Sequence, residues 1–97
     1  MEIRQPYVER YANSITKEDG YVSITGIVVN RGEGVLVIDD GTGQAEVFIE
    51  SNLESNYVRI LGQVISANPV QLQGHIMQDM SKLDKKLYHK VKELLTN

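Results

Sequence analysis

Five β-type segments, separated by turns and one short loop, follow one another between Tyr21 and Met80. Apolar and polar residues alternate within them, which is typical of strands with one buried face. A glycine interrupts each of the three longest segments, at Gly26, Gly62 and Gly74. Because a small barrel coils its strands sharply and glycine relieves the crowding where a strand bends, the pattern predicts a closed five-stranded antiparallel barrel. The predicted strands span residues 21–30, 35–38, 44–49, 57–66 and 70–80.

The period of the pattern changes after the last predicted strand. Between residues 82 and 96, apolar residues recur at spacings of three and four, as on one face of an α-helix. Ser81 precedes this segment as a predicted N-cap, and Asp84 stands three residues later as in a capping box. The sequence therefore predicts an all-β fold with a C-terminal amphipathic α-helix. Its apolar face would consist of Leu83, Leu87, Val91, Leu94 and Leu95.

The length of 97 residues suits one domain with one modest core. Residues 1–19 are polar and weakly patterned, and either a short helix after Pro6 or an extended arm is compatible with them. The predicted organisation is an N-terminal arm over 1–19, a barrel over 20–80 and a C-terminal helix over 81–97. The predicted barrel core consists of Val22, Ile24, Val47, Val58, Ile60, Leu72 and Ile76.

Charge is distributed unevenly along the chain. The net charge of −3 argues against a strongly basic nucleic-acid binder. Residues 1–80 hold five basic and eleven acidic residues, whereas residues 81–97 hold five lysines and two acidic residues. These lysines are expected to form the solvated face of the terminal helix, with contact to nucleic acid as the alternative.

The composition also indicates a compartment. There is no cysteine, which excludes disulfides and thiolate metal sites and fits a reducing environment. The first six residues lack the apolar run of a signal peptide, and no apolar stretch has membrane-spanning length. We expect an intracellular protein without a membrane partner.

No residues form a pattern typical of catalysis or metal binding. The adjacent carboxylates Asp39 and Asp40 are expected to hold a hairpin turn through bonds to the backbone. His75 and His89 are the only histidines, and without cysteine they do not make a zinc site. The sequence predicts a binding protein that is not an enzyme and has no catalytic residues, metal or cofactor.

Several of these runs resemble a known family. Residues 22–29 (VSITGIVV) and the turn 38–43 (IDDGTG) resemble the first three strands of the OB domains of replication protein A. Residues 58–64 (VRILGQV) resemble that family's fourth strand. The run IMQDM at 76–80, followed by a predicted helix, is similar to the middle subunit, archaeal relatives included. The resemblance extends over about residues 20–97 and implies an OB fold, a small five-stranded barrel.

The resemblance also implies a function. In that family the middle subunit binds single-stranded DNA weakly, and its C-terminal helix joins helices of other subunits. This chain would then be an accessory subunit of a replication protein A-like complex in DNA replication or repair. Its helix would bind a larger DNA-binding subunit or other OB-fold subunits. Two alternatives stay open: the helix covers its own barrel, or the protein is a scaffold that binds proteins and no nucleic acid.

Three residues are candidates for contact with a single strand. OB barrels bind single strands with a cationic groove and with aromatic rings on which bases stack. Phe48 is the only phenylalanine, and alternation with Val47 predicts that it points outward. Arg31 in the first turn and Arg59 on the fourth strand could meet phosphates, with solvated surface charge as the alternative. The sequence predicts weak contact with single-stranded DNA through these three residues.

Overall fold

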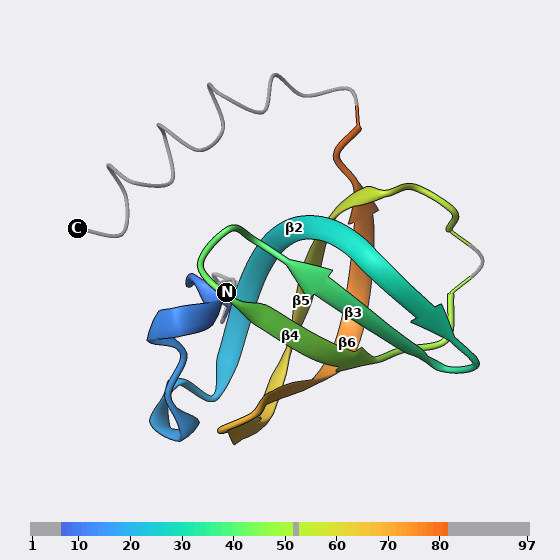
Figure 1. The fold of residues 1–97 in the computed structure, drawn as a ribbon. Helices are drawn as coiled ribbons and strands as arrows, with labels where there is room; N and C mark the ends of the chain where they lie inside the picture. Colours follow the sequence, from blue (N-terminus) through green and yellow to red (C-terminus); the bar gives the residue numbers. More distant parts are fainter. Residues whose placement is uncertain (1–6, 52, 82–97) are drawn as a thin grey trace, which may run out of the picture.

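The computed structural model describes residues 7–51 and 53–81 (Figure 1). Five strands close a barrel in the order β2-β3-β4-β6-β5, and β5 pairs again with β2. Each predicted strand is present, with ends within two residues of those predicted. The strands are β2 (Tyr21–Gly32), β3 (Val35–Asp39), β4 (Gln44–Phe48), β5 (Tyr57–Ala67) and β6 (Val70–Asp79).

The prediction of a purely antiparallel barrel is wrong. Strand β4 runs parallel to β6, with Val47 in register with Leu72. A ring in which every neighbour runs in the opposite direction needs an even number of strands. A closed ring of five therefore contains at least one parallel pair, and β4–β6 is that pair. A further short strand, β1 (Val8–Glu9), also pairs in parallel, with the start of β2.

The predicted class of an all-β fold with a C-terminal α-helix is also corrected. Within the described residues the fold is all-β, and its only helices are the 3₁₀ helices η1 (Ala12–Ser14) and η2 (Lys17–Asp19). The helix predicted over 81–97 lies, from residue 82 on, outside the described residues. A helical period alone does not establish a helix, because most helical stability comes from tertiary packing. The residues predicted for its apolar face, Leu83, Leu87, Val91, Leu94 and Leu95, also lie outside the described residues.

The barrel interior confirms all but one of the predicted core residues. Ile76 is the exception, because 46% of its surface is exposed. Strand β6 carries a β-bulge there: Leu61 pairs with Ile76 and Gly62 pairs with Gly74, which leaves His75 as an extra residue. A bulge breaks the alternation of a strand, so Ile76 points outward. The fully buried interior side chains include Val22, Ile24, Ile38, Val47, Val58, Ile60 and Leu72.

The glycines inside the strands allow backbones to approach each other closely. A Cβ atom on Gly26 would lie 2.6 Å from the carbonyl oxygen of Asp39, and one on Gly62 would overlap the carbonyl oxygen of Gln73. The sequence predicted glycine at bends for relief of crowding. At Gly26 and Gly62 the crowding comes from the backbone of a neighbouring strand, whereas at Gly74 it comes from the side chains of Ile49 and Val47.

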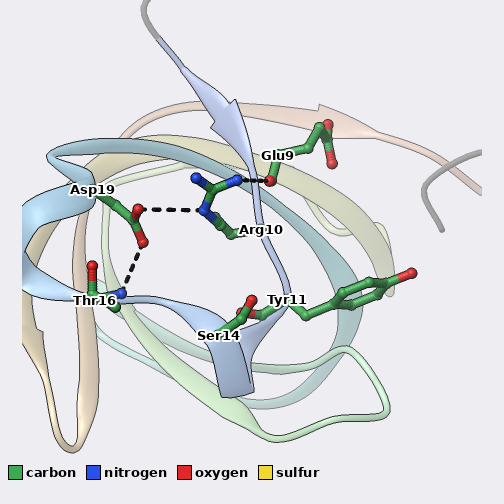
Figure 2. A network of polar contacts seen from close by, with 6 residues as sticks. All are labelled: Glu9, Arg10, Tyr11, Ser14, Thr16 and Asp19. Carbon is green, nitrogen blue, oxygen red and sulfur yellow. Dashed lines mark hydrogen bonds and ion pairs between the residues drawn. The ribbon is translucent and has the colours of Figure 1, made fainter. Parts of the chain in front are cut away.

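The N-terminal segment is held against the barrel. Ala12 and Ile15 are buried and belong to the hydrophobic core. Figure 2 shows that Asp19 accepts hydrogen bonds from two earlier residues, the Nε of Arg10 at 3.3 Å and the backbone nitrogen of Thr16 at 2.8 Å. These bonds hold together the segment that precedes β2, which packs on the barrel core through Ala12 and Ile15.

Candidate nucleic-acid interface

Phe48 lies on the outer face of the sheet formed by β3 and β4. It is in register with Val35 on β3, and both side chains are half-buried. Their chain neighbours Leu36 and Val47 are buried inside the barrel. Alternation therefore places Phe48 outward, on a face where a nucleobase can stack on its ring.

The neighbouring strand supports Phe48 through its backbone. Phe48 is in register with Gln73 of the parallel strand β6. The side-chain amide of Gln73 donates a hydrogen bond of 3.0 Å to the carbonyl oxygen of Phe48. The other polar pair between these strands joins Gln71 to Glu46, with Nε2 donating to Oε1 at 2.8 Å. This face thus has one aromatic ring, neutral amides and one carboxylate.

Arg31 does not share the face of Phe48. It is in register with Leu36, whose side chain points into the barrel, so it extends across the barrel end. Its guanidinium donates hydrogen bonds to the carbonyl oxygens of Leu53, at 3.0 Å, and Ser55, at 2.6 Å. The side chain predicted to meet phosphate therefore holds the loop that follows β4.

The groove next to Arg31 is acidic. It has a volume of about 810 Å³, and its lining includes the apolar side chains Leu36 and Ile49. Three carboxylates also line it, those of Glu33, Glu50 and Glu54. Like charges repel, so this end of the barrel disfavours a phosphate backbone.

Arg59 lies on a different side of the barrel. On β5 it is in register with Thr25 of β2 and Gln78 of β6. Its Nε is 3.6 Å from the carboxylate oxygen Oε1 of Glu9, which also accepts a hydrogen bond from the Ser23 hydroxyl. Phe48, Arg31 and Arg59, the three residues predicted to contact a single strand, therefore do not share one face of the barrel.

The carboxylates of Asp39 and Asp40 hold the turn between β3 and β4, as predicted. Asp39 accepts a 2.8 Å hydrogen bond from the backbone nitrogen of Gly41. Asp40, only 6% exposed, accepts bonds from the backbone nitrogens of Ala12, at 2.7 Å, and Thr42, at 2.9 Å. Among residues 7–51 and 53–81, no group of three histidine, cysteine or acidic side chains could hold a metal ion.

An aromatic cluster that the sequence did not suggest lies elsewhere on the outer surface. The ring centroids of Tyr7 and Tyr21 are 5.8 Å apart, and His75 lies 6.0 Å from the first and 6.1 Å from the second. The Tyr7 hydroxyl and His75 Nδ1 form a hydrogen bond of 2.9 Å. His75 is exposed, but no local pattern in the sequence could link it to residues so far away in the chain.

Within the part of the chain that the structure describes, no helix has the length and hydrophobicity needed to cross a membrane.

Comparison with known proteins gives matches among solved structures alone. No family model and no curated protein matches the chain. A structure of U. maydis replication protein A bound to single-stranded DNA superimposes with a TM-score of 0.73 at 17% identity, over 95% of this chain and 91% of that chain. The telomere capping protein Ten1 of S. pombe gives a TM-score of 0.69 at 14% identity, over 91% of this chain and 95% of that chain. The S. pombe Stn1–Ten1 complex gives 0.72 at 13% identity, over 91% and 90%.

These likenesses concern the fold, because all three identities are low. They extend over nearly the whole of each chain, so the barrel is a complete OB fold. The resemblance to replication protein A that the sequence runs indicated is thereby confirmed for the fold.

Proposed function

We propose that this protein is an intracellular subunit of a single-stranded-DNA-binding complex built from OB-fold subunits. Its main role is assembly, and its own contact with DNA is weak. The observation that carries the proposal is the likeness, over nearly the full length, to replication protein A bound to single-stranded DNA and to the Stn1–Ten1 complex.

The charges of the barrel support weak DNA contact. Residues 1–80 carry eleven acidic and five basic residues, so few counterions would be released on binding a phosphate backbone. Arg31 and Arg59 add positive charge, but both side chains already bond to groups of the protein. Phe48 is the only aromatic residue of β3 and β4 and would provide most of the contact.

An exposed apolar patch on β2 supports a role in assembly. Ile27 and Val29 are 45% and 50% exposed. They line a hollow of about 410 Å³ together with Gly26 and Tyr57. Large exposed apolar side chains grouped beside a hollow are typical of protein-binding surfaces. Binding of a larger DNA-binding subunit, or of another OB-fold subunit, through the apolar residues between 83 and 95 stays a prediction, because they lie outside the described residues.

The acidic groove favours a second candidate function. A barrel end lined by Glu33, Glu50 and Glu54 suits a basic protein segment better than a nucleic acid. The protein would then be an OB-fold scaffold that joins other proteins and binds no nucleic acid.

Fluorescence anisotropy separates the two functions. A labelled oligothymidylate is titrated with this protein alone, and with the complex it forms with a copurified OB-fold subunit, at low and at physiological salt. We expect dissociation constants on the order of micromolar or weaker for the protein alone, with further weakening as salt rises. The scaffold function predicts two results: this protein alone does not bind the oligonucleotide at low salt, and the complex forms but binds it no better than the partner subunit does. Both results together would contradict a role as a DNA-binding subunit.

A further inference from the structure

A row of uncharged, outward-facing side chains continues from Phe48 around the barrel to Tyr21. Phe48 of β4 is in register with Gln73 of β6, which is in register with Gln63 of β5. Gln63 is in turn in register with Tyr21 of β2. Directly paired residues project from the same face of a sheet, so these four side chains form one continuous stripe, the Phe48–Tyr21 row.

The row ends at the aromatic cluster. Tyr21 is 42% exposed, and His75 is exposed beside it. Tyr7 packs against Tyr21 edge to face, with an interplanar angle of 87°. The hydrogen bond to Tyr7 occupies Nδ1 of His75, which leaves Nε2 of the imidazole as its second hydrogen-bonding nitrogen.

The bulge in β6 gives this end of the row its shape. His75 is the extra residue of the bulge and has no paired residue on β5. Bulges re-aim side chains and are over-represented next to functional sites.

The charge of the row distinguishes it from the rest of the barrel. None of its four members, and neither Tyr7 nor His75, is acidic, although the barrel as a whole is. Charged residues flank both ends of the row: η2, which ends two residues before Tyr21, contains Lys17, Glu18 and Asp19, and Glu46 lies two residues before Phe48 on β4. A polyanion that follows the row therefore meets neutral amides and aromatic rings along it, and charges of both signs only beside its ends.

We propose that Tyr21 and His75 form a second base-stacking platform, and that a single strand stacked on Phe48 continues over Gln73 and Gln63 to reach it. Bases of any sequence stack on aromatic rings, while glutamine amides donate to and accept from base edges. From β4 to β2 the row crosses three spacings of about 4.8 Å between neighbouring β-strands, so a single-stranded oligonucleotide must be several nucleotides long to cover it. This proposal rests on the proposed function, since it assumes that the protein contacts single strands.

Oligonucleotides of two lengths test the path. Anisotropy is measured with labelled tetrathymidylate and dodecathymidylate for the full-length protein and its variants. Tyr21→Ala should weaken binding of the longer oligonucleotide on the order of tenfold and leave the shorter one, which binds at Phe48, unchanged. Tyr21→Phe keeps the ring and should bind normally, and Ile65→Ala removes a side chain of similar exposure, 44%, that is not a member of the row. Melting temperatures confirm that each variant is folded.

Photocrosslinking locates the two ends of the strand. Dodecathymidylate with 5-iodouracil near its 5′ or 3′ end is irradiated with the full-length protein, and the crosslinked peptides are identified by mass spectrometry. We expect one end to crosslink at Phe48 and the other at Tyr21 or His75.

The outcomes separate the path from the function. Normal binding by Tyr21→Ala with crosslinks at Phe48 alone overturns the second platform and leaves the proposed function standing. No binding of either oligonucleotide by the unmodified protein overturns the platform, and it overturns the proposed function as well if the complex binds DNA no better than the partner subunit. If Tyr21→Ala instead abolishes association with an OB-fold subunit while oligonucleotide binding is kept, the cluster is a protein-docking surface and the platform is refuted.

Discussion

The hydroxyl of Tyr7 lies 2.9 Å from Nδ1 of His75, although 68 residues separate the two in the chain. The contact ties the segment before β1 to the bulge of the last strand. Since β1 pairs only Val8 and Glu9 with β2, side-chain contacts of this kind have to contribute to the anchoring of the N-terminal segment.

Tyr7→Phe tests that anchor. The ring is kept and the hydrogen bond is lost, so we expect a loss of at most about 1 kcal/mol in the free energy of unfolding. Hydrogen exchange should quicken at the backbone nitrogen of Arg10, which donates to the carbonyl oxygen of Ser23. Unchanged exchange there would show that the Tyr7–His75 hydrogen bond does not help to anchor the segment.

Gly62→Ala should strongly destabilise the barrel. Its Cβ would overlap the carbonyl oxygen of Gln73, and backbone has little freedom to move away in a closed sheet. We expect a loss of about 2–3 kcal/mol, measured by urea denaturation. Gly43→Ala is the matched control, because its Cβ would lie 3.6 Å from the Ala12 side chain, an ordinary contact. Equal effects of the two substitutions would contradict the close-approach explanation.

Asp40→Ala should cost more stability than Asp39→Ala. Asp40 is buried and accepts bonds from the buried backbone nitrogen of Ala12 and the partly buried one of Thr42, so its removal leaves a buried donor without an acceptor, at a cost of about 2–3 kcal/mol. Asp39 bonds at the exposed edge of the turn, and its loss should cost less than about 1 kcal/mol. Thermal melts of both variants provide the comparison, and a reversed order would refute the structural role of Asp40.

Arg31→Lys separates loop anchoring from phosphate contact. Lysine keeps the charge but lacks the planar fork that reaches the carbonyl oxygens of Leu53 and Ser55. We expect faster hydrogen exchange at backbone amides between residues 53 and 57 and unchanged binding of single-stranded DNA. A large loss of binding with unchanged exchange would instead assign the guanidinium to a phosphate.

Phe48→Leu tests the stacking ring on the β3–β4 face. Leucine retains apolar packing against Val35 but offers no ring, so affinity for oligothymidylate should fall by a factor on the order of ten. Phe48→Tyr retains the ring and should bind as the unmodified protein does. Both affinities are measured by anisotropy at low salt, and full affinity in the leucine variant would remove Phe48 from the interface.

The strands and the turn at residues 38–43 could be predicted from the sequence because their signals are local. Alternation within a strand records which face is buried, and the short side chains of Asp39 and Asp40 bond to backbone groups close by. The mid-strand glycines likewise pointed to a closed barrel. Phe48 could be placed outward for the same reason, since its neighbours in the chain mark the buried face.

Cross-strand pairing decided the rest, and no local pattern contains it. Closing a ring of five strands requires a parallel pair, and the bulge at His75 turns Ile76 out of the core into which alternation had placed it. Arg31 appeared free in the sequence, yet its guanidinium holds a loop more than twenty residues away. The same pairing brings Tyr21 and His75 together. Tyr21 on β2 pairs with Gln63 on β5, which pairs with Gln73 on β6, so the two rings become neighbours only when the register of these strands is set.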